Sequence, residues 1–199
     1  MNPREYKGLI LIITAVSALI VASPALQHFL VSPQTEFFTE FYLLGPQHTA
    51  ANFPYNVTSN ENYTIYLGAA NHLGYCAYYQ VEVKFRNQNQ SAPNPFNLTA
   101  SSLPSLYNIT AFVADKQTWE LPLSFSFEYT YNQTQSQIDY NQLTLNGVNL
   151  NLANNYSPWD AQKKVFYGNL VFELWIYNST ISNFQYHERF ASLGFNMTT

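Results

Sequence analysis

Residues 121–131 read LPLSFSFEYTY, and in this stretch every second residue is apolar. Successive side chains of a β-strand point to opposite faces, so a period of two is typical of a strand with one face in a core. The stretch therefore predicts a strand of an antiparallel sheet. Its inward face is expected to carry Leu121, Leu123, Phe125, Phe127, Tyr129 and Tyr131.

Similar patterns lie on both sides of this strand. Strands are predicted at residues 37–44, 63–70, 78–86, 109–113, 165–177 and 184–197, and a hairpin around Asn146-Gly147 within residues 143–152. Residues 63–70 and 78–86 are expected to pair, with Val81 and Val83 inward and Glu82 and Lys84 outward. Helical periodicity is scarce after residue 31. The sequence therefore predicts an all-β sandwich.

A different pattern precedes the strands. Residues 8–31 read GLILIITAVSALIVASPALQHFLV and contain no Asp, Glu, Lys or Arg. A helix needs about 20 apolar residues to cross the ~30 Å hydrocarbon layer of a membrane. Residues 8–31 are therefore predicted to be one transmembrane helix in contact with the lipid bilayer.

Charge asymmetry predicts the orientation of this helix. Arg4 and Lys7 precede it and Glu36 is the first charge after it, which favours a cytoplasmic segment at residues 1–7 and an extracytoplasmic domain at residues 32–199. The expected location is the cell membrane, with a single pass. Two alternatives stay open: a cleaved secretory signal, and cleavage at Lys7-Gly8-Leu9-Ile10, which resembles the site cut by archaeal prepilin peptidases.

The acceptor motif for N-linked glycosylation, Asn-x-Ser/Thr, occurs nine times, always after the apolar stretch. This is about threefold more than random placement of the 22 Asn and the 30 Ser and Thr residues would give. Asn155 is the weakest candidate, because Pro158 follows its serine. N-linked glycans are predicted at Asn56, Asn62, Asn89, Asn97, Asn108, Asn132, Asn155, Asn178 and Asn196.

Several short segments resemble a known family. They are residues 38–45 (FTEFYLLG), Asn52-Phe53-Pro54, Gly68, Asn71-His72 and the alternating strand at residues 79–85. Together they resemble the start of the domain in an archaeal family of membrane-anchored extracytoplasmic proteins whose domain has no known function. The resemblance implies an immunoglobulin-like β domain. Members carry several membrane helices before that domain, whereas this chain has one, so the function of their membrane part does not transfer.

Motifs for catalysis or cofactor binding are missing from the sequence. It contains no Gly-x-Ser-x-Gly, no His-Glu-x-x-His, no phosphate loop and no dinucleotide fingerprint. The sequence therefore predicts a protein that is not an enzyme, with no catalytic residue and no cofactor. Two possibilities stay open: a carboxylate pair brought together by folding, and a carbohydrate platform of exposed aromatic residues.

Metal and nucleic-acid sites are not expected either. The histidines are His28, His48, His72 and His187, and none lies at ligand spacing from another or from Cys76, although folding could bring His48 and His72 together. Cys76, the only cysteine, is expected to be a small buried apolar residue. The two lysines at residues 163–164 do not make a nucleic-acid site.

These features predict a non-catalytic, N-glycosylated cell-envelope protein. Its membrane-anchored extracellular domain would act as a structural or protein-interaction module with protein partners in the envelope. The alternatives are a pilin-like or strand-donating subunit of an archaeal surface filament, and an accessory subunit of a membrane complex.

Overall fold

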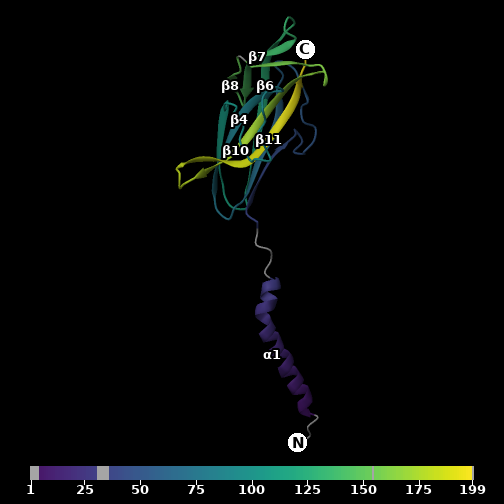
Figure 1. The fold of residues 1–199 in the computed structure, drawn as a ribbon, viewed down its shortest axis with the longest axis vertical. Helices are drawn as coiled ribbons and strands as arrows, with labels where there is room; N and C mark the ends of the chain where they lie inside the picture. Colours follow the sequence, from purple (N-terminus) through teal and green to yellow (C-terminus); the bar gives the residue numbers. More distant parts are fainter. Residues whose placement is uncertain (1–4, 31–35, 154, 199) are drawn as a thin grey trace. The chain divides into compact units, whose positions relative to one another are not determined.

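A computed structural model describes residues 5–30, 36–153 and 155–198, and for residues 5 and 24–30 it describes the backbone alone. The chain divides into two compact units, residues 1–37 and residues 38–199. The described part of the first unit contains the helix α1 (Glu5–Leu30), and that of the second contains eleven strands (Figure 1).

The helix α1 covers the predicted transmembrane stretch except for Val31, which lies outside the described residues. Residues 6–23 are apolar and long enough to cross a membrane, since 18 residues of helix measure about 27 Å. Large apolar side chains are exposed around the whole helix, with Leu11 at 71% and Val21 at 80%. A helix that is apolar on every side needs an apolar environment, such as a protein core or a membrane.

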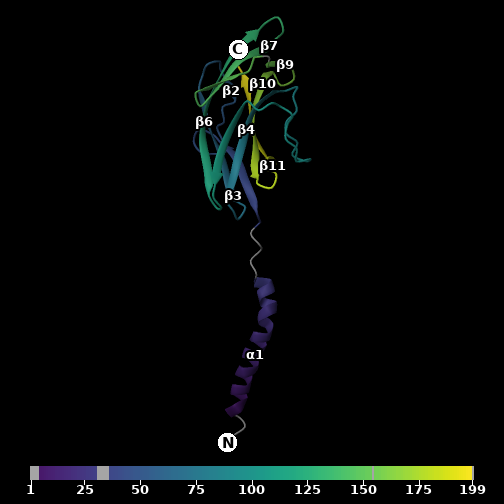
Figure 2. The same ribbon diagram turned by 90° about the vertical axis from the view of Figure 1, so that its left-hand side faces the viewer.

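The second unit is built from two sheets that face each other; β6 and β11 mark their opposite sides in Figure 2. The first sheet contains, in spatial order, β1 (Phe38–Leu44), β3 (Tyr63–His72), β6 (Thr118–Asn132), β7 (Gln137–Leu145) and β8 (Val148–Asn151). The second contains β5 (Tyr107–Val113), β4 (Ala77–Asn87), β10 (Val165–Asn178), β11 (Asn183–Met197) and β2 (Asn56–Val57). The predicted all-β, immunoglobulin-like sandwich after one N-terminal apolar helix is confirmed.

A short strand joins the two sheets at one end of the sandwich. β9 (Tyr156–Asp160) pairs with β7 of the first sheet, where Ile138 lies opposite Ser157. It also pairs with β10 of the second sheet, where Phe166 lies opposite Trp159. Side chains from both sheets therefore meet around β9.

The core lies between the sheets. Phe125 and Phe127 of β6 face Phe85 of β4 and Phe195 of β11, and the rings of Phe127 and Phe195 lie 5.2 Å apart. Burying each side chain of this size stabilises the fold by about 1.5–3 kcal/mol. The inward faces predicted from alternation are confirmed at Leu123, Phe125, Phe127 and Tyr129 of β6 and at Tyr79, Val81, Val83 and Phe85 of β4. Leu121 is half-buried, and the prediction for Tyr131 is wrong: at the end of β6 this side chain is 42% exposed, because it lines an open pocket instead of the core.

The predicted pairing of residues 63–70 with residues 78–86 is wrong. β3 pairs with β1 and β6, whereas β4 pairs with β10 and β5, so the turn at residues 73–76 carries the chain from one sheet to the other. Both strands have an apolar face, and stacking these faces across the core buries both of them. Alternation shows that a face is buried but does not show which strand lies beside it.

The hairpin predicted at Asn146-Gly147 is confirmed. β7 ends at Leu145, which lies opposite Val148 at the start of β8. Asn146 and Gly147 have φ of 46° and 80°, and a two-residue turn of this kind needs positive φ at both central residues.

Candidate functional site

The nine acceptor asparagines form two groups by exposure, and none of them is buried. The exposed group lies on β2, on β5 and in the loops that precede β3 and β5; the half-buried group lies at strand ends. The exposed residues are Asn56, Asn62, Asn89, Asn97 and Asn108, and the half-buried ones are Asn132, Asn155, Asn178 and Asn196.

The two groups also differ at Nδ2, the side-chain nitrogen to which a glycan is attached. In every half-buried asparagine this nitrogen donates a hydrogen bond within the protein. The acceptors are Asp139 Oδ2 (3.0 Å, from Asn132), Leu152 O (3.2 Å, from Asn155), Gln185 Oε1 (3.1 Å, from Asn178) and Asn56 Oδ1 (3.2 Å, from Asn196). Within the described ranges, Nδ2 of the five exposed asparagines donates no such bond. The exposed group is thus the better set of acceptors.

The motif at Asn155 differs from the other eight at its third residue. Ser157 is 0% exposed. Its Oγ donates a hydrogen bond to the carbonyl oxygen of Tyr167 at 2.6 Å and lies 2.9 Å from the hydroxyl of Tyr140. The sequence marks Asn155 as weak because of Pro158, and the burial of the serine is a second, independent reason.

A buried ion pair lies on the outer face of the second sheet. Lys84 of β4 is 3% exposed and Glu173 of β10 is 0% exposed. Lys84 Nζ lies 2.7 Å from Glu173 Oε2 and 3.0 Å from Glu82 Oε2. Glu82 and Glu173 lie opposite each other in neighbouring strands. The ammonium group therefore separates two carboxylates that would otherwise repel each other.

The loop between β4 and β5, residues 88–106, covers this ion pair. Ser101 donates two hydrogen bonds to Glu173 Oε1, from its backbone nitrogen at 2.8 Å and from its Oγ at 2.6 Å. Lys84 Nζ in turn donates to the carbonyl oxygen of Ser101 at 3.3 Å. Lys84 does point outward, as alternation predicts, but the loop then buries it. These contacts hold the loop against the sheet.

Large aromatic side chains surround the ion pair. Lys84 Nζ lies 6.0 Å from the ring centre of Trp175, and the ring of Trp175 packs edge-on against Tyr186 at 5.6 Å. Burial and the negative charge of Glu173 raise the pKa of the Tyr186 hydroxyl to about 12. Because Glu173 has no exposed surface, its carboxylate can anchor the loop but is closed to a ligand.

Folding does not bring His48 and His72 together, a possibility that the sequence left open. His48 Nδ1 lies 3.0 Å from Glu120 Oε1 and its ring stacks on Tyr66, whereas His72 stacks on Phe38. His28 lies in the part of α1 that is described by its backbone alone. Across residues 5–30, 36–153 and 155–198, no group of three or more His, Cys, Asp or Glu is placed to hold a metal ion.

His187 and Cys76 lie near the end of the sandwich where β1 begins. His187 Nε2 lies 2.8 Å from Thr39 Oγ1, which lies 2.8 Å from the hydroxyl of Tyr79. Burial, and then the positive charge of Arg189, lower the pKa of His187. The expectation that Cys76 is buried is wrong: it is exposed, because it lies in the turn that crosses between the sheets.

Four aromatic rings lie side by side on the outer face of the second sheet, one from each of four neighbouring strands. This aromatic strip consists of Phe112 (β5), Tyr78 (β4), Tyr177 (β10) and Phe184 (β11). Tyr78 and Phe112 stack at 4.1 Å, and Tyr177 and Phe184 pack at 5.5 Å. Phe112 is 73% exposed and Tyr177 is 41% exposed. Large contiguous exposed apolar patches are typical of interaction sites.

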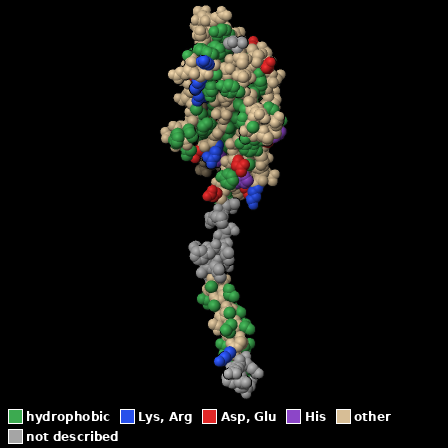
Figure 3. All heavy atoms as spheres, turned by 90° about the vertical axis from the view of Figure 1, so that its right-hand side faces the viewer, with side chains coloured by type: hydrophobic (Ala, Val, Ile, Leu, Met, Phe, Trp, Pro, Cys, Tyr) green, Lys and Arg blue, Asp and Glu red, His purple; other side chains and the backbone are tan. Residues whose placement is uncertain are grey.

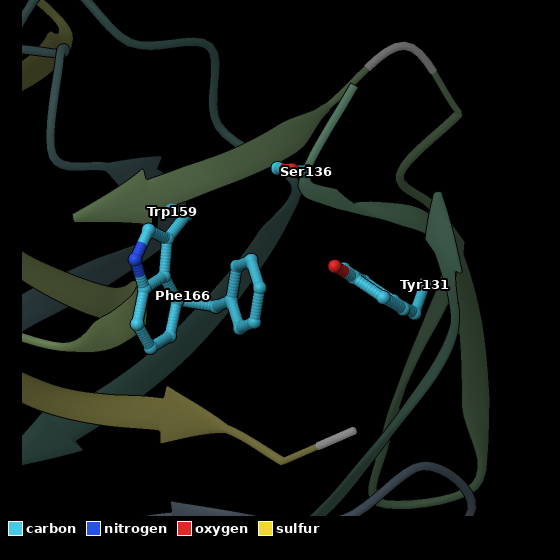
Figure 4. Close-up of a pocket in the computed structure, with 4 residues that line it drawn as sticks. All are labelled: Tyr131, Ser136, Trp159 and Phe166. Atoms are coloured by element: carbon cyan, nitrogen blue, oxygen red, sulfur yellow. The ribbon is translucent and has the colours of Figure 1, made fainter. Parts of the chain in front are cut away.

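A pocket of about 340 Å³ lies at the other end of β10, where β9 joins the two sheets. Trp159 of β9, Phe166 of β10, Tyr131 of β6 and Ser136 of the β6–β7 turn line it. In Figure 4 the indole and phenyl rings lie on one side, and the Tyr131 hydroxyl points toward them from the other. The sequence leaves an aromatic platform open but does not single out these residues, because they come from three separate strands and a turn.

Charged side chains are sparse on the sandwich, as the predominance of tan over red and blue atoms on the face in Figure 3 illustrates. Only 10% of the residues are charged, and several of these form the ion pairs and hydrogen bonds described above. Uncharged groups therefore dominate the surface that is open to a partner.

Comparisons with known proteins give one family and several similar structures. The family model "Domain of unknown function (DUF1616)" matches residues 32–150. No curated protein matches the chain. Among solved structures, the chain is similar to the CARDB domain of a Pyrococcus furiosus protein in complex with di-metal ions, with 8% identity, 83% of this chain and 97% of that chain covered, and a TM-score of 0.40. It is also similar to a β-glucosidase from Listeria innocua in complex with glucose, with 8% identity, 81% of this chain and 16% of that chain covered, and a TM-score of 0.37.

Proposed function

This chain belongs to the DUF1616 family, and we propose that it is a membrane-anchored, N-glycosylated protein of the cell envelope. Its β-sandwich would lie outside the membrane and bind other envelope proteins, without catalysing a reaction. The resemblance of residues 38–85 to an archaeal family supports an archaeal envelope. The apolar helix α1 supports the single-pass anchor, and the basic residues at its start support a cytoplasmic N-terminus.

The observation that carries the proposal is the state of the acceptor asparagines. Five of them are exposed with Nδ2 free of protein hydrogen bonds in the described part of the chain, and in each of these motifs the Ser or Thr is exposed as well. Glycan transfer takes place on the outer side of the membrane, so these acceptors support an extracytoplasmic sandwich. Sugars attached there would also add polar groups to a surface that carries few charges.

Mass spectrometry of the chain from its native membrane tests the glycosylation. Glycans are expected at Asn56, Asn62, Asn89, Asn97 and Asn108, with lower occupancy at the half-buried acceptors and none at Asn155. The burial of Ser157 is the reason for the last expectation. A chain with all nine asparagines unmodified would remove the main support for the proposal.

The exposed single cysteine allows a direct test of orientation. Cys76 is exposed and is the only cysteine, so a membrane-impermeant maleimide is expected to label it in intact cells. The matched control is the double variant Cys76→Ser, Asn2→Cys, which is expected to react only after the cells are lysed. The opposite pattern would place the sandwich in the cytoplasm and contradict the proposal.

The aromatic strip supports protein interaction as the role of the domain. Its four rings lie on one sheet face and two of them are more than 40% exposed. We expect Phe112→Ser to weaken co-purification of partners in mild detergent. Val148→Ser on β8, which also replaces an exposed apolar side chain, is the matched control and is expected to have no effect. Equal recovery of partners with both variants would show that the aromatic strip does not take part in the interaction.

N-terminal sequencing separates the anchor from a filament subunit. An anchored chain keeps residues 1–8, whereas a chain cut after Gly8 would begin at Leu9. In that case α1 would be free to pack against copies of itself in a filament, and the proposal of a membrane anchor would be wrong.

A further inference from the structure

The pocket at β9 has the chemistry of a site for a neutral sugar ring. Trp159 is 43% exposed and Tyr131 is 42% exposed, so both rings are open to a ligand. Phe166 is 6% exposed and packs against both of them, with ring centres 4.8 Å from Trp159 and 5.5 Å from Tyr131. One face of a pyranose ring carries C–H groups, and these pack on the electron-rich faces of aromatic rings.

Polar groups of the pocket are free to bind hydroxyl groups. The Tyr131 hydroxyl and Ser136 Oγ make no hydrogen bond with any other described residue, and both residues are exposed. Each hydroxyl can donate and accept, whereas the indole nitrogen of Trp159 lies on the edge of the ring turned away from them (Figure 4). The pocket thus combines apolar faces with several free donors and acceptors, as a polyhydroxyl ligand with one apolar face requires.

No charged side chain among the described residues lines this pocket, which favours a neutral ligand. Asp139 accepts hydrogen bonds from the side chains of Gln137 and Asn132. Asp160 accepts from the backbone nitrogens of Gln162 and Lys163, both at 3.0 Å. The volume of about 340 Å³ lies at the small end of the range for ligand pockets, about 300–1,000 Å³, which suits one or two sugar rings.

The wall of the pocket is rigid enough to position a ligand. The backbone nitrogen of Trp159 donates to the carbonyl oxygen of Ser136 at 3.0 Å, which ties β9 to the β6–β7 turn. The pairing of β9 with both sheets fixes Trp159 from either side. The rings are therefore held in place before a ligand arrives, which lowers the entropic cost of binding.

A second hollow, of about 270 Å³, shares Trp159 and Phe166 with the first. The acceptor Asn196 and the cationic Lys164 line it, and Asn196 Oδ1 accepts a hydrogen bond from the backbone nitrogen of Phe166 at 3.0 Å. A glycan attached to Asn196 would therefore begin beside the indole. A glycan on Asn196, or a separate saccharide, would supply the sugar at this end of the sandwich.

We infer that Trp159, Tyr131 and Phe166 form a binding site for a neutral pyranose ring, contributed by a glycan of this chain or by a separate saccharide. Tyr131 and Ser136 hold its hydroxyl groups, and Trp159 packs against its apolar face. The site lies at the end of β10 opposite the aromatic strip, so it does not depend on the proposed protein-binding surface.

Binding of separate saccharides is tested on the full-length chain made in a host that attaches no glycans. The chain is kept in a detergent without a sugar headgroup, and saturation-transfer NMR is recorded with the methyl glycosides of glucose, mannose, galactose and N-acetylglucosamine. Glucuronic acid is the charged comparison. At least one neutral glycoside is expected to bind, with glucuronic acid weaker, because the described residues place no cation in the pocket beside Tyr131 and Ser136; Lys164 lines the adjoining hollow.

Substitutions in the pocket test whether saccharides bind there. Trp159→Ala is expected to weaken it at least tenfold and Tyr131→Phe about threefold, whereas Phe112→Ala at the other end of the second sheet leaves it unchanged. Tyr131→Phe and Ser136→Ala each remove only a hydroxyl group, so they test the site even if Trp159→Ala disturbs the fold. Binding that is equal in all of these variants would overturn the inference.

The glycan of the chain itself is tested on material from the native membrane. Nuclear Overhauser contacts between sugar protons and the indole of Trp159 are expected if the source is internal, and Asn196→Gln or Asn132→Gln would remove them. If no probe binds through Trp159 and no attached sugar contacts its indole, the site does not bind sugar. A chain that carries no glycans but binds free glycosides would contradict the proposed glycosylation and leave this site intact.

Discussion

The two faces of the second sheet are buried by different means. On the inner face of β10, Leu170, Phe172 and Leu174 are 0% exposed and meet apolar side chains of the first sheet. On the outer face Glu173 is equally buried, but it meets Lys84 and a loop. Apolar burial needs only matching shapes, whereas a buried charge needs a partner for each lone pair. Equal exposure thus conceals different responses to mutation.

A substitution on the inner face is expected to cause the largest loss of stability. Phe172→Ala removes a ring from a close-packed core, and we expect the free energy of unfolding to fall by about 4 kcal/mol. Phe112→Ala, on the exposed end of the outer face, is the matched control and should cost less than about 1 kcal/mol. Urea unfolding of the full chain in detergent, followed by tryptophan fluorescence, measures both. Similar losses would mean that the strip is packed like a core.

Breaking the ion pair of the outer face is expected to cause the second-largest loss of stability. Glu173→Gln leaves Lys84 buried with only Glu82 to pair with, and we expect a loss of about 3 kcal/mol in the same measurement. The double variant Lys84→Met, Glu173→Leu removes both charges and should recover most of that loss. A double variant less stable than Glu173→Gln would show that the charges themselves stabilise the fold.

Removing one contact between the loop at residues 88–106 and the sheet is expected to have a smaller effect on the free energy of unfolding. Ser101→Ala removes the 2.6 Å hydrogen bond to Glu173 Oε1 and keeps the bond from the backbone, so a loss of about 1.5 kcal/mol is expected. Hydrogen exchange in residues 88–106 should rise at the same time. Ser102→Ala, which removes a hydroxyl from an exposed residue of the same loop, is the control and should leave exchange as it is.

The smallest effect is expected from His187, as a dependence on pH. Its pKa is lowered in the fold, mainly by burial, so the unfolded chain binds more protons just below the ordinary pKa of about 6.5. The stability that neutral His187 contributes is therefore complete above about pH 6.5 and is lost as the pH falls through the lowered pKa. His187→Gln should flatten the stability curve between about pH 7 and pH 5. An unchanged slope would assign the dependence to other groups.

Strand positions follow from the sequence because alternation is a local property. The inward residues of β4, the middle of the inward face of β6 (Leu123 to Tyr129) and the turn at Asn146-Gly147 are predicted correctly, whereas Tyr131 at the end of β6 is exposed. The pairing of residues 63–70 with 78–86 fails, because adjacent strands in the sequence can be stacked as well as paired. The prediction that Cys76 is buried fails for a related reason: composition suggests burial, but the turn that crosses between the two sheets lies at the surface.

The candidate sites depend on tertiary structure to different degrees. The acceptor motifs are visible in the sequence, yet the hydrogen bonds at Nδ2 that divide them come from residues up to 140 positions away. Glu173 stands inside an apolar strand, VFELW, which is a signal that a partner is required. Neither Lys84 nor Ser101 can be chosen as that partner from the sequence, because they lie 89 and 72 residues away.

The sequence by itself determined that a charge-free apolar stretch of helical length, residues 8–31, precedes a strand-rich domain with many N-glycosylation motifs. These are consequences of composition and local periodicity, which act over a few residues. Only the tertiary structure decided which strands pair, how the loop at residues 88–106 buries Lys84 and Glu173, and that Trp159, Phe166 and Tyr131 surround one pocket. Those outcomes depend on contacts between segments far apart in the chain, where packing and hydrogen bonding select one arrangement among many that share the same local pattern.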